Sequence, residues 1–359
     1  MVESSHGKDV EVYKGLQALR GYAALSVMVG HAIKEWAATY NVATPFDVEP
    51  LLYGVDIFFV ISGFIMYRTS RELFAVPGGV RTFALKRLLR IVPLYWLFTT
   101  LMVVTLLVLS DHVRSTEFEP WNVISSYLFI PSERPGGRIA PVLSLGWTLN
   151  YEMFFYAIFA AALMFPRRLG VSLLVATIVG LVIYGAVFQP NLVALRFWTS
   201  SIILEFAAGV VLAVVIGKRA PLPVSLALLA IGAVLLQSRM FGFAGNLPRC
   251  VAGGIPATFL VAGVTLLPRI QDARVPAWAT VLGDSSYALY LGHRFVLRAA
   301  TIVFDGLPLA NPAGLAIYCI TVTAIAVVMS IVVFHWIERP MLAQGRRLLF
   351  RQRSVFAEQ

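Results

Sequence analysis

An arginine and a histidine stand at the two ends of an otherwise uncharged segment, RGYAALSVMVGH, which runs from Arg20 to His31. In a helix, eleven residues turn through about 1,100°, within about 20° of a whole number of turns, so both side chains would share one face about 16 Å apart. Histidine is the side chain best suited to move a proton near neutral pH, which makes His31 a candidate acid–base catalyst. The alternatives are a structural histidine bonded to a neighbouring helix and an arginine that extends its charge to the membrane surface.

Two carboxylic acids lie in further apolar segments, where a carboxylate is costly unless it is paired. Asp56 lies in GVDIFFVISGFI, and Glu152 lies in WTLNYEMFFY together with Trp147 and Tyr151. We expect Glu152 to pair with His31 or to orient its imidazole, and Asp56 to lie at a comparable depth. A structural hydrogen bond explains Asp56 equally well, and an aromatic belt at a membrane interface explains Trp147.

A basic stretch, FALKRLLRIVPLYW, precedes another apolar segment. It contains Arg87 and Arg90, three residues apart and therefore neighbours on one helical face. Paired guanidinium groups are well suited to binding phosphate. The alternative is a positive anchor that only fixes the orientation of the segment. Further along, Ser286, Tyr290 and His293 also align, at positions i, i+4 and i+7.

The elements that must position these residues are membrane-spanning helices. Of the 359 residues, 58% are hydrophobic and 13% are charged, about half the charged fraction of a typical soluble domain. Apolar runs of about 20 residues, long enough to cross a bilayer, recur along the chain. We predict an all-α, polytopic integral membrane protein with a single bundle of about ten transmembrane helices, at residues 15–38, 51–69, 91–110, 144–165, 169–188, 196–217, 222–240, 250–268, 280–304 and 313–337. The apolar stretch 120–131 is too short to span and is predicted to be re-entrant or interfacial.

The distribution of positive charge predicts the orientation of the bundle. With the N-terminus in the cytoplasm, the cytoplasmic loops and ends hold nineteen Lys and Arg residues, against seven on the other side. We therefore predict two cytoplasmic termini: a tail at 1–14, a transmembrane domain at 15–338 and a basic tail at 339–359. The same bias accounts for the net charge of +10 without a nucleic acid partner. Cys250 and Cys319 show no metal-ligand spacing, and no metal is expected.

Together, these motifs resemble the membrane-bound acyltransferase family 3, and within it the ExoZ-type exopolysaccharide acetyltransferases. The Arg-x10-His motif of the family falls on Arg20 and His31, and its Arg-x-x-Arg motif falls on Arg87 and Arg90. The other segments follow in the family's order: GVDIFFVISGFIM, LGWTLNYEMFFYAIF, LEFAAGVVLA, LGDSSYALYLGH and WIERP. The sequence departs from the pattern around His293, because many relatives have an aromatic residue beside this histidine.

The resemblance implies a multi-pass enzyme of the bacterial cytoplasmic (inner) membrane. It would take an acyl group, usually acetyl, from cytoplasmic acetyl-CoA without a metal. The acceptor would be a sugar hydroxyl of an exopolysaccharide or surface glycan, or of its polyprenyl-linked oligosaccharide precursor. Membrane lipid would surround the bundle, and both a homo-oligomer and a polysaccharide assembly complex are compatible with this activity.

Each candidate residue receives a role on this basis. His31 would be the catalytic base or a transient acyl carrier, with Glu152 as its anionic partner and Arg20 lining the path of the CoA arm. Arg87 and Arg90 would hold the phosphates of acyl-CoA. The residues predicted to bind the acceptor substrate are Asp56, Trp147 and Tyr151.

Two other classes of protein fit part of the pattern. A transporter or flippase also lines its pathway with ionisable groups, but the two related halves with broken helices that many transporters have are not apparent in this sequence. A structural subunit of a polysaccharide-export system would not need an aligned Arg20 and His31.

Overall fold

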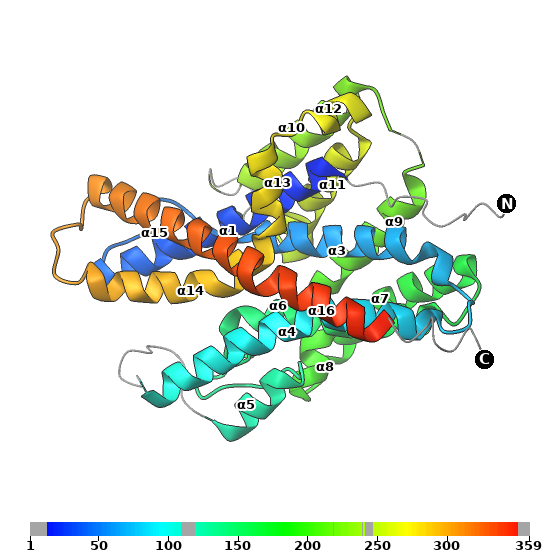
Figure 1. The fold of residues 1–359 in the computed structure, drawn as a ribbon, viewed down its shortest axis with the longest axis horizontal. Helices are drawn as coiled ribbons and strands as arrows, with labels where there is room; N and C mark the ends of the chain where they lie inside the picture. The colour runs from blue at the N-terminus through cyan, green and yellow to red at the C-terminus, as the bar shows by residue number, and fades with distance from the viewer. Residues whose placement is uncertain (1–12, 109–118, 218, 239, 241–246, 351–359) are drawn as a thin grey trace.

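The computed structural model describes residues 13–108, 119–217, 219–238, 240 and 247–350. Within these ranges the fold is all-helical, with only an isolated antiparallel bridge between Glu133 and Ile139. The predicted tails lie partly outside the described residues, at 1–12 and 351–359. The helices that form the bundle are α1 (Lys14–Tyr40), α3 (Gly54–Ser70), α4 (Gly79–Val108), α6 (Trp147–Ala162), α7 (Arg167–Phe188), α9 (Leu204–Val215), α10 (Leu222–Ser238), α11 (Ile255–Leu266), α14 (Ser286–Val303) and α15 (Pro312–Val333) (Figure 1).

Each apolar segment predicted to span the membrane overlaps one of these helices. Shorter pieces connect or extend them: α2 (Glu49–Leu52), η1 (Arg71–Leu73), α5 (Pro120–Tyr127), η3 (Ser144–Gly146), α8 (Val193–Trp198), η4 (Ser201–Ile203), η6 (Cys250–Gly254), α12 (Arg269–Ala273), α13 (Ala277–Asp284), η7 (Phe334–Glu338) and α16 (Arg339–Phe350). Among the described residues, four helical stretches are long and apolar enough to cross a bilayer, namely Glu49–Leu73, Gly79–Val108, Arg167–Phe188 and Pro312–Leu348. The number of crossings and the side on which the termini lie stay predictions.

Two glycines allow a close contact between helices α3 and α9. A side chain on Gly63 would lie 2.1 Å from the carbonyl oxygen of Phe206, and one on Gly209 would lie 2.1 Å from that of Val60. Any larger residue at either position would push the backbones apart, which is why small residues favour tight packing of apolar helices. This contact holds α3, which carries a large part of the candidate site.

Helices α15 and α16 are joined without a break by the π-helical segment η7. α15 begins at a capped end, where the Asn311 side chain accepts a hydrogen bond from the Gly314 amide at 2.8 Å and Pro312 follows. The wider turns of η7 then lead directly into α16. Residues 339–350 of the predicted basic tail are therefore helical, and Gly345 packs against Leu89 of α4.

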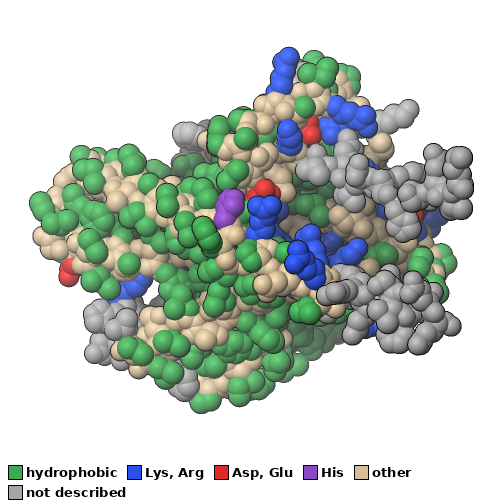
Figure 2. All heavy atoms as spheres, in the orientation of Figure 1, with side chains coloured by type: hydrophobic (Ala, Val, Ile, Leu, Met, Phe, Trp, Pro, Cys, Tyr) green, Lys and Arg blue, Asp and Glu red, His purple; other side chains and the backbone are tan. Residues whose placement is uncertain are grey.

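Positive charge is unevenly distributed over the face drawn in Figure 2. α1 begins and α16 ends to the right of centre in Figure 1. On the face drawn in Figure 2, in the same orientation, most Lys and Arg side chains lie in that right half, whereas hydrophobic side chains dominate the left. On this face, the half with most Lys and Arg is the half where α1 begins, which is the end predicted to be cytoplasmic.

Candidate active site

A cavity of about 220 Å³ lies between α1, α3, α4, α6 and α14. Its walls combine apolar side chains with an unusual number of charged and hydroxyl groups. They are formed by Arg20, Val55, Phe58, Phe59, Ile61, Ser62, Ile65, Arg87, Arg90, Ile91, Thr148, Leu149, Glu152, Tyr156, Ser286, Tyr287 and Tyr290. Four of the eight predicted site residues therefore line one cavity.

Three arginines from two helices supply the positive charge of the cavity. Arg20, on α1, donates a hydrogen bond to the Gln17 side chain at 3.0 Å. Arg87 donates to the Thr69 hydroxyl at 2.6 Å. Arg90, one turn further along α4, forms an ion pair with Glu338 of η7. α4 begins at Gly79 rather than near residue 91, so this basic stretch is the first part of a 30-residue helix, of which Arg87 and Arg90 face the cavity.

Glu152 is the carboxylate of this cavity and not the partner of His31, so the predicted pairing is wrong. Its Oε1 accepts hydrogen bonds from Ser62 at 3.0 Å and from Tyr156 at 2.5 Å. Tyr156 lies one turn away on the same helix, and this local donor takes the carboxylate oxygen. Glu152 thus stands among Arg20, Arg87 and Arg90 as the only carboxylate that lines the described cavity.

His31 pairs instead with His293 of α14. The His31 Nδ1 lies 3.0 Å from the His293 Nε2, and the two rings stack with centroids 5.2 Å apart. The His293 Nδ1 lies 3.0 Å from the Leu289 carbonyl oxygen, which can only accept a hydrogen bond, so this nitrogen carries a proton.

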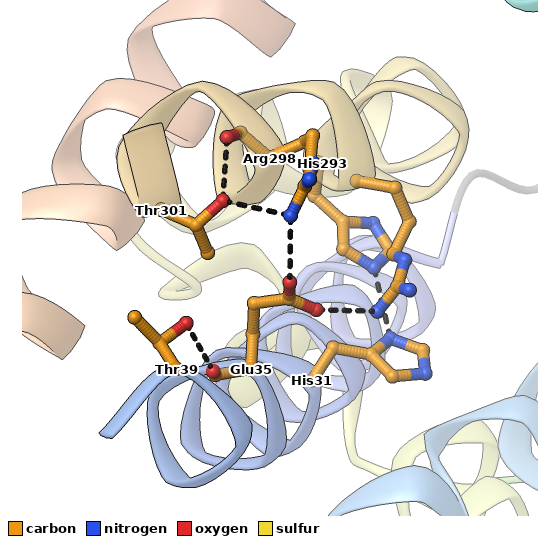
Figure 3. A network of polar contacts seen from close by, with 7 residues as sticks. His31, Glu35, Thr39, His293, Arg298 and Thr301 are labelled. Atoms are coloured by element: carbon orange, nitrogen blue, oxygen red, sulfur yellow. Dashed lines mark hydrogen bonds and ion pairs between the residues drawn. The ribbon is translucent and has the colours of Figure 1, made fainter. Parts of the chain in front are cut away.

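The protonation of His31 follows from this chain of hydrogen bonds. In the neutral His293 ring the Nε2 is an acceptor, so the His31 Nδ1 must donate to it. The His31 Nε2 is then unprotonated, and in Figure 3 it points away from the pair. His31 is thereby oriented as a base by a neutral histidine rather than by a carboxylate.

Charged residues surround the histidine pair on the side of α1 and α14 that leads away from the cavity. Glu35 follows His31 by one turn and lies 3.6 Å from Arg294 and 4.0 Å from Arg298 (Figure 3). Neither His31 nor His293 lines the cavity.

An aromatic layer separates the cavity from the histidines. Phe58 and Tyr290 both line the cavity, their ring centroids are 6.1 Å apart, and the Tyr290 ring lies 6.2 Å from that of His293. The Tyr290 hydroxyl is fixed between Thr148 and the Leu145 carbonyl, at 3.1 and 3.2 Å. Phe58 makes no hydrogen bond through its side chain and is held by apolar packing alone.

Asp56 lies elsewhere, in a buried ion pair that the sequence did not reveal. Arg249 donates to both of its carboxylate oxygens, at 3.2 and 2.7 Å, and Asp56 is fully buried. The Arg249 guanidinium also lies 5.4 Å from the centre of the Trp147 ring. Tyr151 stacks on Phe197 with centroids 3.9 Å apart.

The residues predicted to bind the acceptor, Asp56, Trp147 and Tyr151, lie apart from the cavity, and their role stays a prediction. None of the three lines the cavity, and each Asp56 carboxylate oxygen accepts a hydrogen bond from Arg249. A buried carboxylate requires a cationic partner, which is the signal that could have directed attention to Arg249.

One hydroxyl in the cavity has no partner. Ser286, at the start of α14, lines the cavity and is fully buried, and its Oγ makes no hydrogen bond among the described residues. Within the same ranges no group of three His, Cys, Asp or Glu side chains could hold a metal ion.

Comparisons with known proteins place the chain in a family. The family described as an acyltransferase domain matches residues 13–331. The chain is 35% identical over 301 residues to the exopolysaccharide production protein ExoZ of Rhizobium meliloti (strain 1021), covering 82% of this chain and 90% of that protein. It is 27% identical over 378 residues to YrhL of Bacillus subtilis (strain 168), a protein named as a peptidoglycan O-acetyltransferase, covering 94% of this chain but only 56% of that protein. No solved structure matches.

The family match extends over the helices that carry the cavity and the histidine pair. It confirms the resemblance seen in the sequence motifs. The chain therefore belongs to the acyltransferase family 3 and is a membrane-bound acyltransferase.

Proposed function

We propose that this protein transfers an acetyl group from cytoplasmic acetyl-CoA to a sugar hydroxyl of an exopolysaccharide, or of its lipid-linked precursor, in the bacterial inner membrane. The observation that carries the proposal is a cavity lined by three arginines on one side of the Phe58–Tyr290 layer and an oriented histidine base on the other. An acyltransferase that joins a donor from one side of a membrane to an acceptor from the other needs two such compartments.

The arginine-lined cavity suits the donor. Acyl-CoA is an anion, and guanidinium groups bind phosphate through charge-assisted hydrogen bonds. Arg87 and Arg90 would contact the phosphates, while the pantetheine arm enters past Arg20. Glu152 balances part of the positive charge when the cavity is empty and keeps Tyr156 and Ser62 in place.

The transfer step uses His31 as a general base. The His31 Nε2 accepts the proton of the sugar hydroxyl while the oxygen of that hydroxyl attacks the carbonyl carbon of the thioester. The carbon–sulfur bond then breaks, and the departing CoA sulfur takes the proton from the imidazolium. His293 is a positioning residue, because its Nε2 holds the His31 Nδ1 proton throughout.

The acetyl group must pass the Phe58–Tyr290 layer to reach His31, so this layer is expected to restrict the size of the acyl group. Replacing Phe58 with alanine is expected to raise the ratio of kcat/KM for butyryl-CoA over acetyl-CoA about tenfold. The reason is that one methylene in an apolar pocket contributes about 1–3 kcal/mol to discrimination. The ratio is measured with purified protein and the two donors.

The matched control is Ile65→Ala, which shortens an apolar side chain on the same wall of the cavity two turns away. An equal change of the ratio in both variants, or no change in Phe58→Ala, would show that the layer does not select the acyl group.

The proposal as a whole is tested with purified protein in lipid nanodiscs. Given acetyl-CoA and an oligosaccharide, it should release CoA thiol in an acceptor-dependent manner and produce O-acetyl signals in the NMR spectrum of the glycan. Transport of a glycan across vesicles without thiol release would favour a flippase instead.

A further inference from the structure

Cations gather around His31 on the side away from the cavity. Lys34 follows His31 by three residues on α1, and Arg294 directly follows His293 on α14; the charge of Arg138, in the loop after α5, also acts on His31. Along both α1 and α14 these residues follow the histidine, whereas Arg20, Ser286 and Tyr290 of the cavity precede it. The cations therefore flank the face of the site that an acceptor would approach.

Among the described residues, the nearby carboxylates do not match all of these cations. Glu49 is matched to Lys34 by a contact of 2.6 Å. Glu35 is shared between Arg294 and Arg298 at 3.6 and 4.0 Å, both longer than a hydrogen bond. Arg138 is exposed and has no carboxylate partner among the described residues. In the described part of the chain, positive charge is thus in excess beside the base, with Arg138 as its most accessible group.

The loop that carries Arg138 is held in place. Arg134 donates to the carbonyl oxygens of Ala140 and Val142 at 3.0 and 2.8 Å, and its own amide bonds the Arg138 carbonyl at 3.0 Å. The turn passes through Gly136 and Gly137, whose positive φ angles of 92° and 83° suit glycine. A fixed backbone lowers the entropy cost of binding a ligand, and the hydrogen bonds of this loop fix the backbone at Arg138.

We propose that the acceptor carries an anionic group, a carboxylate or a phosphate, which Arg138 and Arg294 hold while the reacting hydroxyl lies at the His31 Nε2. This inference rests on the proposed function and names the class of its acceptor: an acidic saccharide or a saccharide diphosphate. The two sources share the same chemistry, a charge-assisted hydrogen bond to guanidinium. A neutral glycan would leave the excess positive charge without a counterpart.

The test compares three acceptors with purified protein in nanodiscs and acetyl-CoA. They are a neutral oligosaccharide, the same oligosaccharide with one glucuronate, and the neutral oligosaccharide linked to polyprenyl diphosphate. We expect kcat/KM for at least one anionic acceptor to exceed that for the neutral one about tenfold, with the difference shrinking at high salt. A preference for the glucuronate alone identifies a carboxylate, and a preference for the diphosphate alone identifies the lipid-linked precursor.

Arg138→Gln is expected to lower kcat/KM for the preferred acceptor about tenfold, because glutamine keeps a hydrogen-bond donor but loses the charge. Arg168→Gln, an exposed arginine at the start of α7, is the matched control and should leave all values as in the parent protein. Equal kcat/KM for all three acceptors, or an unaltered preference in Arg138→Gln, would overturn the inference and leave the acetyl transfer intact. The absence of thiol release with every acceptor would instead overturn the proposed function itself.

Discussion

Replacing His31 with alanine is expected to lower the rate of acetyl transfer by about 10²–10⁴, the usual contribution of a general base. A sugar hydroxyl is a weak nucleophile near pH 7, and in the structure the His31 Nε2 is the unprotonated nitrogen that the His293 hydrogen bond leaves available. The measurement is the O-acetyl content of the polysaccharide, by NMR, in a deletion strain that carries either the parent or the His31→Ala gene, normalised to the membrane abundance of each protein.

Two further histidine variants make the result specific. His335→Ala removes an exposed histidine of η7 and should leave acetylation at the parent level. His293→Phe keeps an aromatic ring but removes the acceptor for the His31 Nδ1 proton, so its rate should fall between those of the other two variants. Parent-level acetylation by a stably expressed His31→Ala protein would leave His31 as a structural residue.

The positions of the helices could be predicted from the sequence because each depends on a local property, the length of an apolar run. The cavity was predictable to a similar extent. Arg87 and Arg90 share a helical face by spacing alone, and the structure places both in the cavity wall with Arg20.

The partners of the buried charges could not be predicted, because they depend on contacts between distant segments. His31 and His293 are 262 residues apart, and Asp56 and Arg249 are 193 apart. Depth in the membrane allowed Glu152 to reach His31, but depth does not fix the direction of a side chain around its helix. The nearer donor, Tyr156, was visible at i+4, and local geometry would have favoured it.

Arg90 has a second role that the sequence did not suggest, and it changes how the CoA site must be tested. Its partner Glu338 is the last residue of the predicted transmembrane domain, directly before the predicted tail, and is only 2% exposed. Arg87, in contrast, bonds a neutral hydroxyl. Replacing both arginines would therefore disturb folding and donor binding together.

Arg90→Gln is expected to destabilise the bundle by about 3 kcal/mol, because it leaves the Glu338 carboxylate buried without its cation. The partial exposure of Arg90 places this effect at the lower end of the range for buried pairs. Arg90→Gln/Glu338→Gln removes both charges and should recover most of the lost thermal stability in detergent, yet still bind CoA about tenfold more weakly than the parent.

Arg87→Gln should weaken CoA binding to a similar degree with little loss of stability, since Thr69 is not left with an unpaired charge. Because the double variant separates folding from binding, parent-like CoA affinity in both it and Arg87→Gln would reduce the two arginines to anchors of α4 and remove the phosphate site from the mechanism.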